Sequence, residues 1–254
     1  MKLLLENWHS YLKEDIKGRS LDQYATELTK EVMHILKKDE FIKNIDKKGH
    51  AMETLKSPLI DELDSIRDIF IHVQQDEKYG VAEGHVMTHG SYEYTLGGDE
   101  EERKTSDLHI NIVLPLEYDF SVFSNLVPDL KSTFRHELEH SSQPTEMLDI
   151  THKKVPDEDI WKTLERAEDY YTNEAETKAH VAGLYKKAKM LKMPASKVVD
   201  TFLGELIETA MVSGYTEEEV KPLIMKIRGW WLHYMKHRYP EAETWPWWDL
   251  EGED

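Results

Sequence analysis

Two histidines and a glutamate in the segment FRHELEHSSQ, residues 134–143, have a spacing that could hold a metal ion. His136 and His140 are four residues apart, so on an α-helix both imidazoles lie on one face, about one turn apart. Glu137 would then lie beside the ion and could accept a proton from water, as in a zinc hydrolase. The alternative is a surface helix with an accidental H-E-x-x-H pattern, because the chain is rich in Glu and His.

A catalytic zinc site needs a third protein ligand and keeps one position open for water. The chain has no cysteine, so this ligand must be a histidine or a carboxylate. The segment YYTNEAETKAH offers Glu174 and Glu176 on a second predicted helix. Residues 141–143 are Ser-Ser-Gln, which argues against a three-histidine HExxHxxGxxH site and favours a His-His-Glu site.

A zinc hydrolase also needs a donor for the negative charge that develops on the substrate oxygen. The candidate donors are His152, Tyr170, Tyr171 and His180. His180 lies one turn beyond Glu176, although an ordinary packing histidine is an equally good interpretation. A second histidine pair, His85 and His89, falls in a predicted strand, where four residues span roughly 13 Å, too far for one ion.

The elements that must position these residues predict an α+β fold. Alternation at Ile69, Ile71 and Val73, and again from Leu108 to Leu114, predicts a small, mostly antiparallel sheet between about residues 66 and 116. Helical periodicity is found over residues 20–38, 128–143, 157–191 (with a break near 172–173), 196–213 and 216–238. Residues 39–57 are charged and poorly patterned, which predicts a loop with short helical pieces.

These elements suggest three regions along the chain. We expect an N-terminal helical region over residues 1–65, a catalytic core over 66–192 and a C-terminal helical region over 193–254 that packs on the core. The core would contain the sheet, the HExxH helix and the downstream ligand helix.

The charge of the chain bears on its partners. Lysine and arginine total 32 and aspartate and glutamate total 50, giving a net charge of −18. Such a surface repels phosphate backbones, so we expect no nucleic-acid partner. No apolar run approaches the roughly 18 residues that span a bilayer, so we expect no membrane partner and a cytoplasmic protein.

The two chemical segments together resemble a known family. HELEH followed by YYTNEAETKAHVAGLYKKA is similar to the gluzincin-type metallopeptidases encoded in bacteriophage genomes. Their pattern is H-E-L-x-H and then a helix with Tyr-Tyr-x-Asn-x-x-Glu-x-x-Ala. The resemblance covers about residues 90–190 and implies a zincin-like core, with Zn²⁺ bound by His136, His140 and Glu176.

The resemblance also implies that Glu137 is the catalytic glutamate of a peptidase acting on a protein or peptide, in the host cytoplasm or the virion. Relatives often have proline where this chain has Glu174, which leaves a second carboxylate near the site. The alternative function is a zincin-fold phage structural or interaction protein with a vestigial or structural metal site. Glu137 favours the enzyme, because structural zinc needs no general base.

Overall fold

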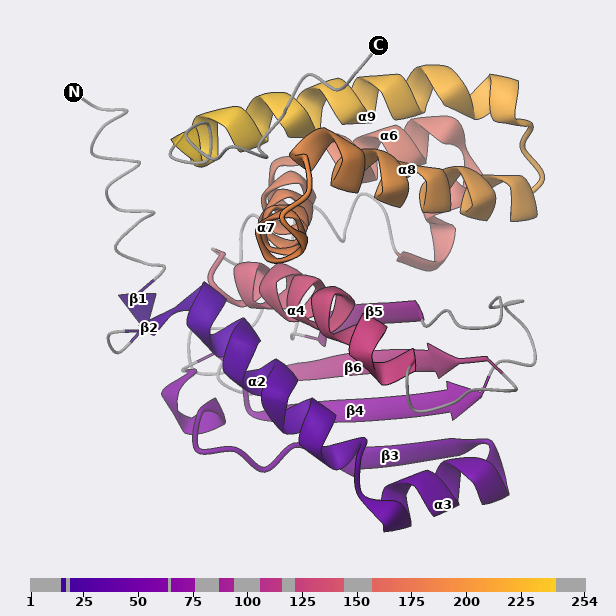
Figure 1. Ribbon diagram of the computed structural model, residues 1–254. Helices are drawn as coiled ribbons and strands as arrows, with labels where there is room; N and C mark the ends of the chain where they lie inside the picture. Colours follow the sequence, from indigo (N-terminus) through magenta and orange to yellow (C-terminus); the bar gives the residue numbers. More distant parts are fainter. Residues whose placement is uncertain are drawn as a thin grey trace. The chain divides into compact units, whose positions relative to one another are not determined.

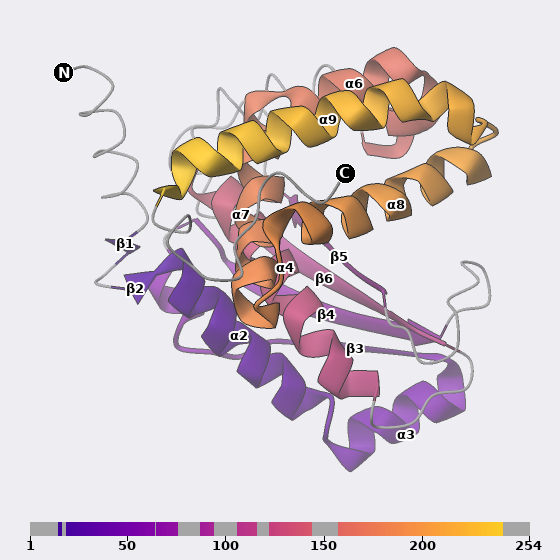
Figure 2. The ribbon, with the colours of Figure 1, turned by 45° about the horizontal axis from the view of Figure 1, so that its top comes forward.

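The chain forms two compact units, Met1–Ser142 and Gln143–Asp254. The computed structural model describes residues 15–16, 19–63, 65–75, 87–93, 106–115, 122–143 and 157–240 (Figures 1 and 2). Their helices and strands confirm the expected α+β class. Among these residues, no helix is both long enough and apolar enough to cross a membrane.

The first unit contains a four-stranded sheet in the order β3-β4-β6-β5. Its strands are β3 (His50–Thr54), β4 (Asp68–Gln75), β5 (Met87–Glu93) and β6 (Asp107–Leu114). The two central strands, β4 and β6, are parallel, whereas both edge strands are antiparallel to their neighbours. The sheet is therefore mixed. A short hairpin of β1 (Asp15–Ile16) and β2 (Arg19–Ser20) precedes it.

The alternating residues of β4 and β6 make the core of this unit. Ile69 and Ile71 of β4 and Leu108 and Ile110 of β6 are completely buried, as the sequence pattern predicts. Helices α2 (Leu21–Ile35) and α4 (Val122–Ser141) cross one face of the sheet side by side (Figures 1 and 2). Burying these side chains is the main source of stability for the layer that holds the HExxH motif.

Residues 39–57 are more regular than expected. Helix α3 (Asp39–Lys48) ends at Gly49, whose left-handed φ of 73° suits glycine, and β3 follows at once. The expected short helical piece is present as α3, whereas the strand β3 was not expected. Phe41 and Ile45 anchor α3, and Ala51 anchors β3. The segment is short and rich in charged residues, so its few apolar positions did not stand out in the sequence.

Helix α4 begins six residues before Pro128 rather than after it. Proline lacks an N–H, so it is tolerated best near a helix start. The expectation of a helix that opens at Pro128 was wrong, because residues 122–127 are also helical.

The second unit is made of helices. They are η3 (Asp157–Lys162), α6 (Leu164–Thr172), α7 (Glu174–Leu191), α8 (Ala195–Val212) and α9 (Glu217–Arg238). Trp231 of α9 is fully buried, and its indole N–H donates to the carbonyl oxygen of Tyr171 at 2.9 Å. The break predicted near residues 172–173 is confirmed at Asn173, which separates α6 from α7.

Candidate metal centre

A stripe of apolar residues fixes the orientation of α4 in the first unit. Leu126, Leu130, Phe134 and Leu138 recur every four residues and are completely buried. This stripe packs into the core and fixes the rotation of the helix about its axis, so His136 and His140 lie away from it, while Glu137, three residues after Phe134, lies at its edge. Core packing thereby determines the direction of the HExxH side chains.

His136 and His140 converge. Their Nε2 atoms lie 3.1 Å apart and their rings meet edge to face, with centroids 4.8 Å apart. Two nitrogens that bind one tetrahedral zinc at 2.0–2.1 Å lie about 3.3 Å from each other. The observed separation therefore suits two ligands of a single ion. His140 is buried, and the His136 side chain is 17% exposed.

Glu137 lies beside this pair. One of its carboxylate oxygens, Oε1, is 3.8 Å from Nε2 of His136, and the side chain is buried. The three residues each place a potential ligand atom within 4.8 Å of the others. The first unit thus brings together the two predicted histidine ligands and the predicted general base.

Strand β5 supplies the surface on which the Glu137 side chain lies. A Cβ atom on Gly90 would be 2.5 Å from both Cγ and Oε1 of Glu137. Gly90 lies inside a continuous strand and pairs with Ile110. The signal that could have identified its role is a lone glycine within a strand pattern, which is typical of close approach.

A buried ionic network lies on the side of α4 adjacent to the one that carries His136 and His140. Arg135 donates from Nη1 to Glu139 at 2.6 Å and from Nε to Asp22 of α2 at 3.2 Å. Buried charges require such partners, because an unpaired one is costly to remove from water. Sequence reasoning missed this network, since the partner on α2 is more than a hundred residues away.

The second unit holds the predicted third ligand. Asn173 caps α7 by accepting a hydrogen bond from the backbone N–H of Glu176 at 2.9 Å. The Glu176 side chain is buried, and its Oε2 lies 3.8 Å from Nε2 of His180. Glu174 differs: its side chain is 66% exposed and pairs with Lys178 at 2.7 Å. His136 and Glu176 belong to different units, and Glu176 as the third ligand stays a prediction.

Aromatic rings surround the candidate accessory residue His180. Its ring stacks on Trp231 with centroids 4.7 Å apart and lies 5.6 Å from the ring of Tyr171. This packing supports the interpretation of His180 as a packed core histidine that also lies next to Glu176. Two of the histidines considered in the sequence, His85 and His152, lie outside the described residues.

His89, the other histidine of the pair in the predicted strand, is in β5 next to Gly90. Desolvation lowers its pKa below the ordinary 6.5. In the register of the sheet it pairs with Asn111 of β6. Successive strand residues point to opposite faces, so His89 points away from the face on which Gly90 meets Glu137.

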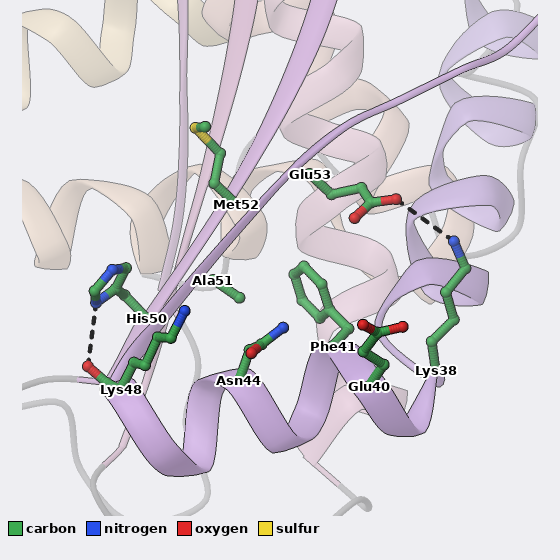
Figure 3. Close-up of a pocket in the computed structure, with 9 residues that line it drawn as sticks. All are labelled: Lys38, Glu40, Phe41, Asn44, Lys48, His50, Ala51, Met52 and Glu53. Atoms are coloured by element: carbon green, nitrogen blue, oxygen red, sulfur yellow. Dashed lines mark hydrogen bonds and ion pairs between the residues drawn. The ribbon is translucent and has the colours of Figure 1, made fainter.

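A hollow of about 390 Å³ lies elsewhere in the first unit, between α3 and β3 (Figure 3). Its lining includes a Lys38–Glu53 ion pair at 3.6 Å and the His50 ring, whose Nδ1 lies 3.1 Å from the carbonyl oxygen of Lys48. The Lys38, Glu53 and His50 side chains interact with neighbours in the same segment and do not converge as metal ligands would. The HExxH segment is the better candidate for chemistry.

Comparison of the chain with protein-family models, with curated proteins and with solved structures finds no match. The functional argument therefore rests on the residues and their geometry.

Proposed function

We propose that this protein is a zinc-dependent peptidase. The observation that supports this best is the pair of Nε2 atoms of His136 and His140, 3.1 Å apart, with the buried Glu137 carboxylate beside them. Imidazole nitrogens and carboxylates are ligands that zinc prefers in proteins, and the absence of cysteine agrees with such a site. The proposed ligands are His136, His140 and Glu176.

Zinc, when bound, polarises a substrate carbonyl and lowers the pKa of a water molecule toward about 7. Glu137 is the general base in this proposal. Its carboxylate accepts a proton from the attacking water and delivers it to the amine that leaves when the peptide bond breaks. The two histidines bind through neutral rings, and their side-by-side geometry on α4 is determined before substrate arrives.

Glu137 also separates this function from the alternative. A structural or vestigial metal site in an interaction protein needs ligands but no adjacent base. Burying a carboxylate beside two converging imidazoles costs stability, because removing a charge from water is unfavourable, and a general base at this position gives that cost a function. We therefore propose hydrolysis of a protein or peptide substrate, without a nucleic-acid or membrane partner, in the cytoplasm of the cell that produces the chain.

The test is a comparison of the full chain with its Glu137→Gln variant. Both are purified, their zinc is measured by elemental analysis, and hydrolysis of a diverse library of fluorogenic peptides is followed. We expect both proteins to hold zinc and only the parent to cleave, with a loss of at least about 100-fold in the variant. Zinc without hydrolysis in the parent would instead support the structural site, and no zinc in the parent would refute both.

A further inference from the structure

Strand β5 and helix α4 lie alongside each other in a fixed register. The hydroxyl oxygens of Thr88 and Thr133 are 3.0 Å apart and form a hydrogen bond between the two elements. Two residues further along the strand is Gly90, and four residues further along the helix is Glu137. Two strand residues advance about 6.7 Å and four helical residues about 6 Å, so the second pair meets as the first does.

Gly90 leaves the space that Glu137 occupies. A Cβ atom there would lie 2.5 Å from Cγ and Oε1 of Glu137 and 2.7 Å from its Cδ. Backbone conformation does not explain the glycine, because among the described residues positive φ angles belong to Gly49, Gly214 and Lys192. The close approach of the Glu137 side chain is the reason that glycine is needed in this strand.

We propose that Gly90 is a positioning residue for the general base, and that any side chain at position 90 would displace the Glu137 carboxylate. This inference rests on the proposed peptidase function. The three atoms nearest to an added Cβ all belong to the Glu137 side chain, which can shift by rotation about its own bonds. A Gly90→Ala variant should therefore fold, while its carboxylate moves relative to His136.

The effect of displacing the Glu137 carboxylate is measured as a change in kcat. We expect Gly90→Ala to keep its zinc and to lower kcat by roughly 10- to 100-fold, because an ångström of misplacement in a catalytic group has an effect of this size. KM should stay within about twofold, since the proton-accepting group acts in the chemical step. The matched control is Gly229→Ala in α9, where an added Cβ would meet nothing within 4 Å, and which should leave kcat unchanged.

Thermal unfolding tests the same contact without any need for activity. Where the backbone allows it, Gly→Ala is usually stabilising, because it restricts the unfolded chain. We expect Gly90→Ala to lower the unfolding midpoint of the parent but to raise it in a Glu137→Ala background, where the three nearest atoms are gone. The sign of the effect should invert between the two backgrounds.

The outcomes separate the two proposals. Equal midpoint shifts in both backgrounds, or an unchanged kcat in Gly90→Ala, would overturn the positioning role even if the parent is a peptidase. A parent that binds zinc but cleaves no peptide would overturn the proposed function. The thermal comparison would then decide alone whether Gly90 sets the position of the Glu137 side chain.

Discussion

Arg135 and Glu139 form a buried ion pair one helical turn long, with Nη1 2.6 Å from Oε2, on the side of α4 next to His136 and His140. Both side chains are at most 5% exposed. Arg135 also reaches Asp22 at the start of α2. Since Arg135 is adjacent to His136 in the chain, this network resists rotation of α4 about its axis and so holds the direction of both imidazoles.

Replacing Arg135 with methionine should destabilise the first unit by about 3–5 kcal/mol, because it leaves the Glu139 carboxylate buried without its cation. Urea unfolding of the parent and of the Arg135→Met variant measures this difference in the free energy of unfolding. The control is Arg228→Met, which breaks an exposed pair with Asp200 and should change the free energy of unfolding by no more than about 1 kcal/mol. Similar losses in the two variants would contradict a special role for the buried pair.

His140→Ala should abolish zinc binding, since it removes one of only two imidazoles on this helix face. Elemental analysis is expected to show about one zinc ion per parent chain and almost none in the variant. His237→Ala is the matched control: His233 and His237 are also four residues apart, with ring centroids 4.4 Å apart on α9, but both are exposed. If the His237→Ala variant loses the zinc ion and the His140→Ala variant keeps it, the ion is bound by His233 and His237, which would contradict our proposal.

Glu176→Gln and Glu174→Gln should differ in zinc affinity. Glu176 is buried, whereas Glu174 extends into solvent beside Lys178. Loss of a direct ligand should weaken binding by more than the roughly 10- to 100-fold that follows loss of a supporting group. Competition with a fluorescent chelator measures both affinities. If only the Glu174→Gln variant releases zinc, Glu174 is the third ligand and Glu176 is not.

Asn173→Ala should lower the free energy of unfolding by about 1 kcal/mol, because the side chain caps α7. It should also weaken zinc binding, since the same side chain holds the backbone N–H of Glu176. Thr216→Ala, which removes the corresponding cap of α9, is the control for stability alone. Chemical denaturation and chelator competition are measured on both. Equal effects on zinc would show that capping acts on the site only through global stability.

Much of this architecture could be predicted from local patterns. The buried faces of β4 and β6, the Ser20 cap of α2 and the break at Asn173 all follow from periodicity and capping residues within a short window. The convergence of His136 and His140 follows from helical spacing alone.

The remaining features depend on contacts between distant segments. The parallel pairing of β4 with β6 is a matter of strand order, which alternation does not specify. The approach of Glu137 to Gly90 joins residues 47 positions apart, and the Arg135–Asp22 contact joins residues 113 positions apart. No pattern in a short window contains that information.

The parallel pairing in the centre of the sheet has a kinetic consequence. Residue 75 ends β4 and residue 107 begins β6, so a long stretch of chain must close before the central ladder forms. The second unit is entirely helical in its described part, so its backbone hydrogen bonds are local, and helical folds form faster than those that depend on pairing of distant strands. We expect the second unit to reach its native state first on refolding. The HExxH helix, at the end of the first unit, would then acquire its final orientation only when the slower sheet is complete.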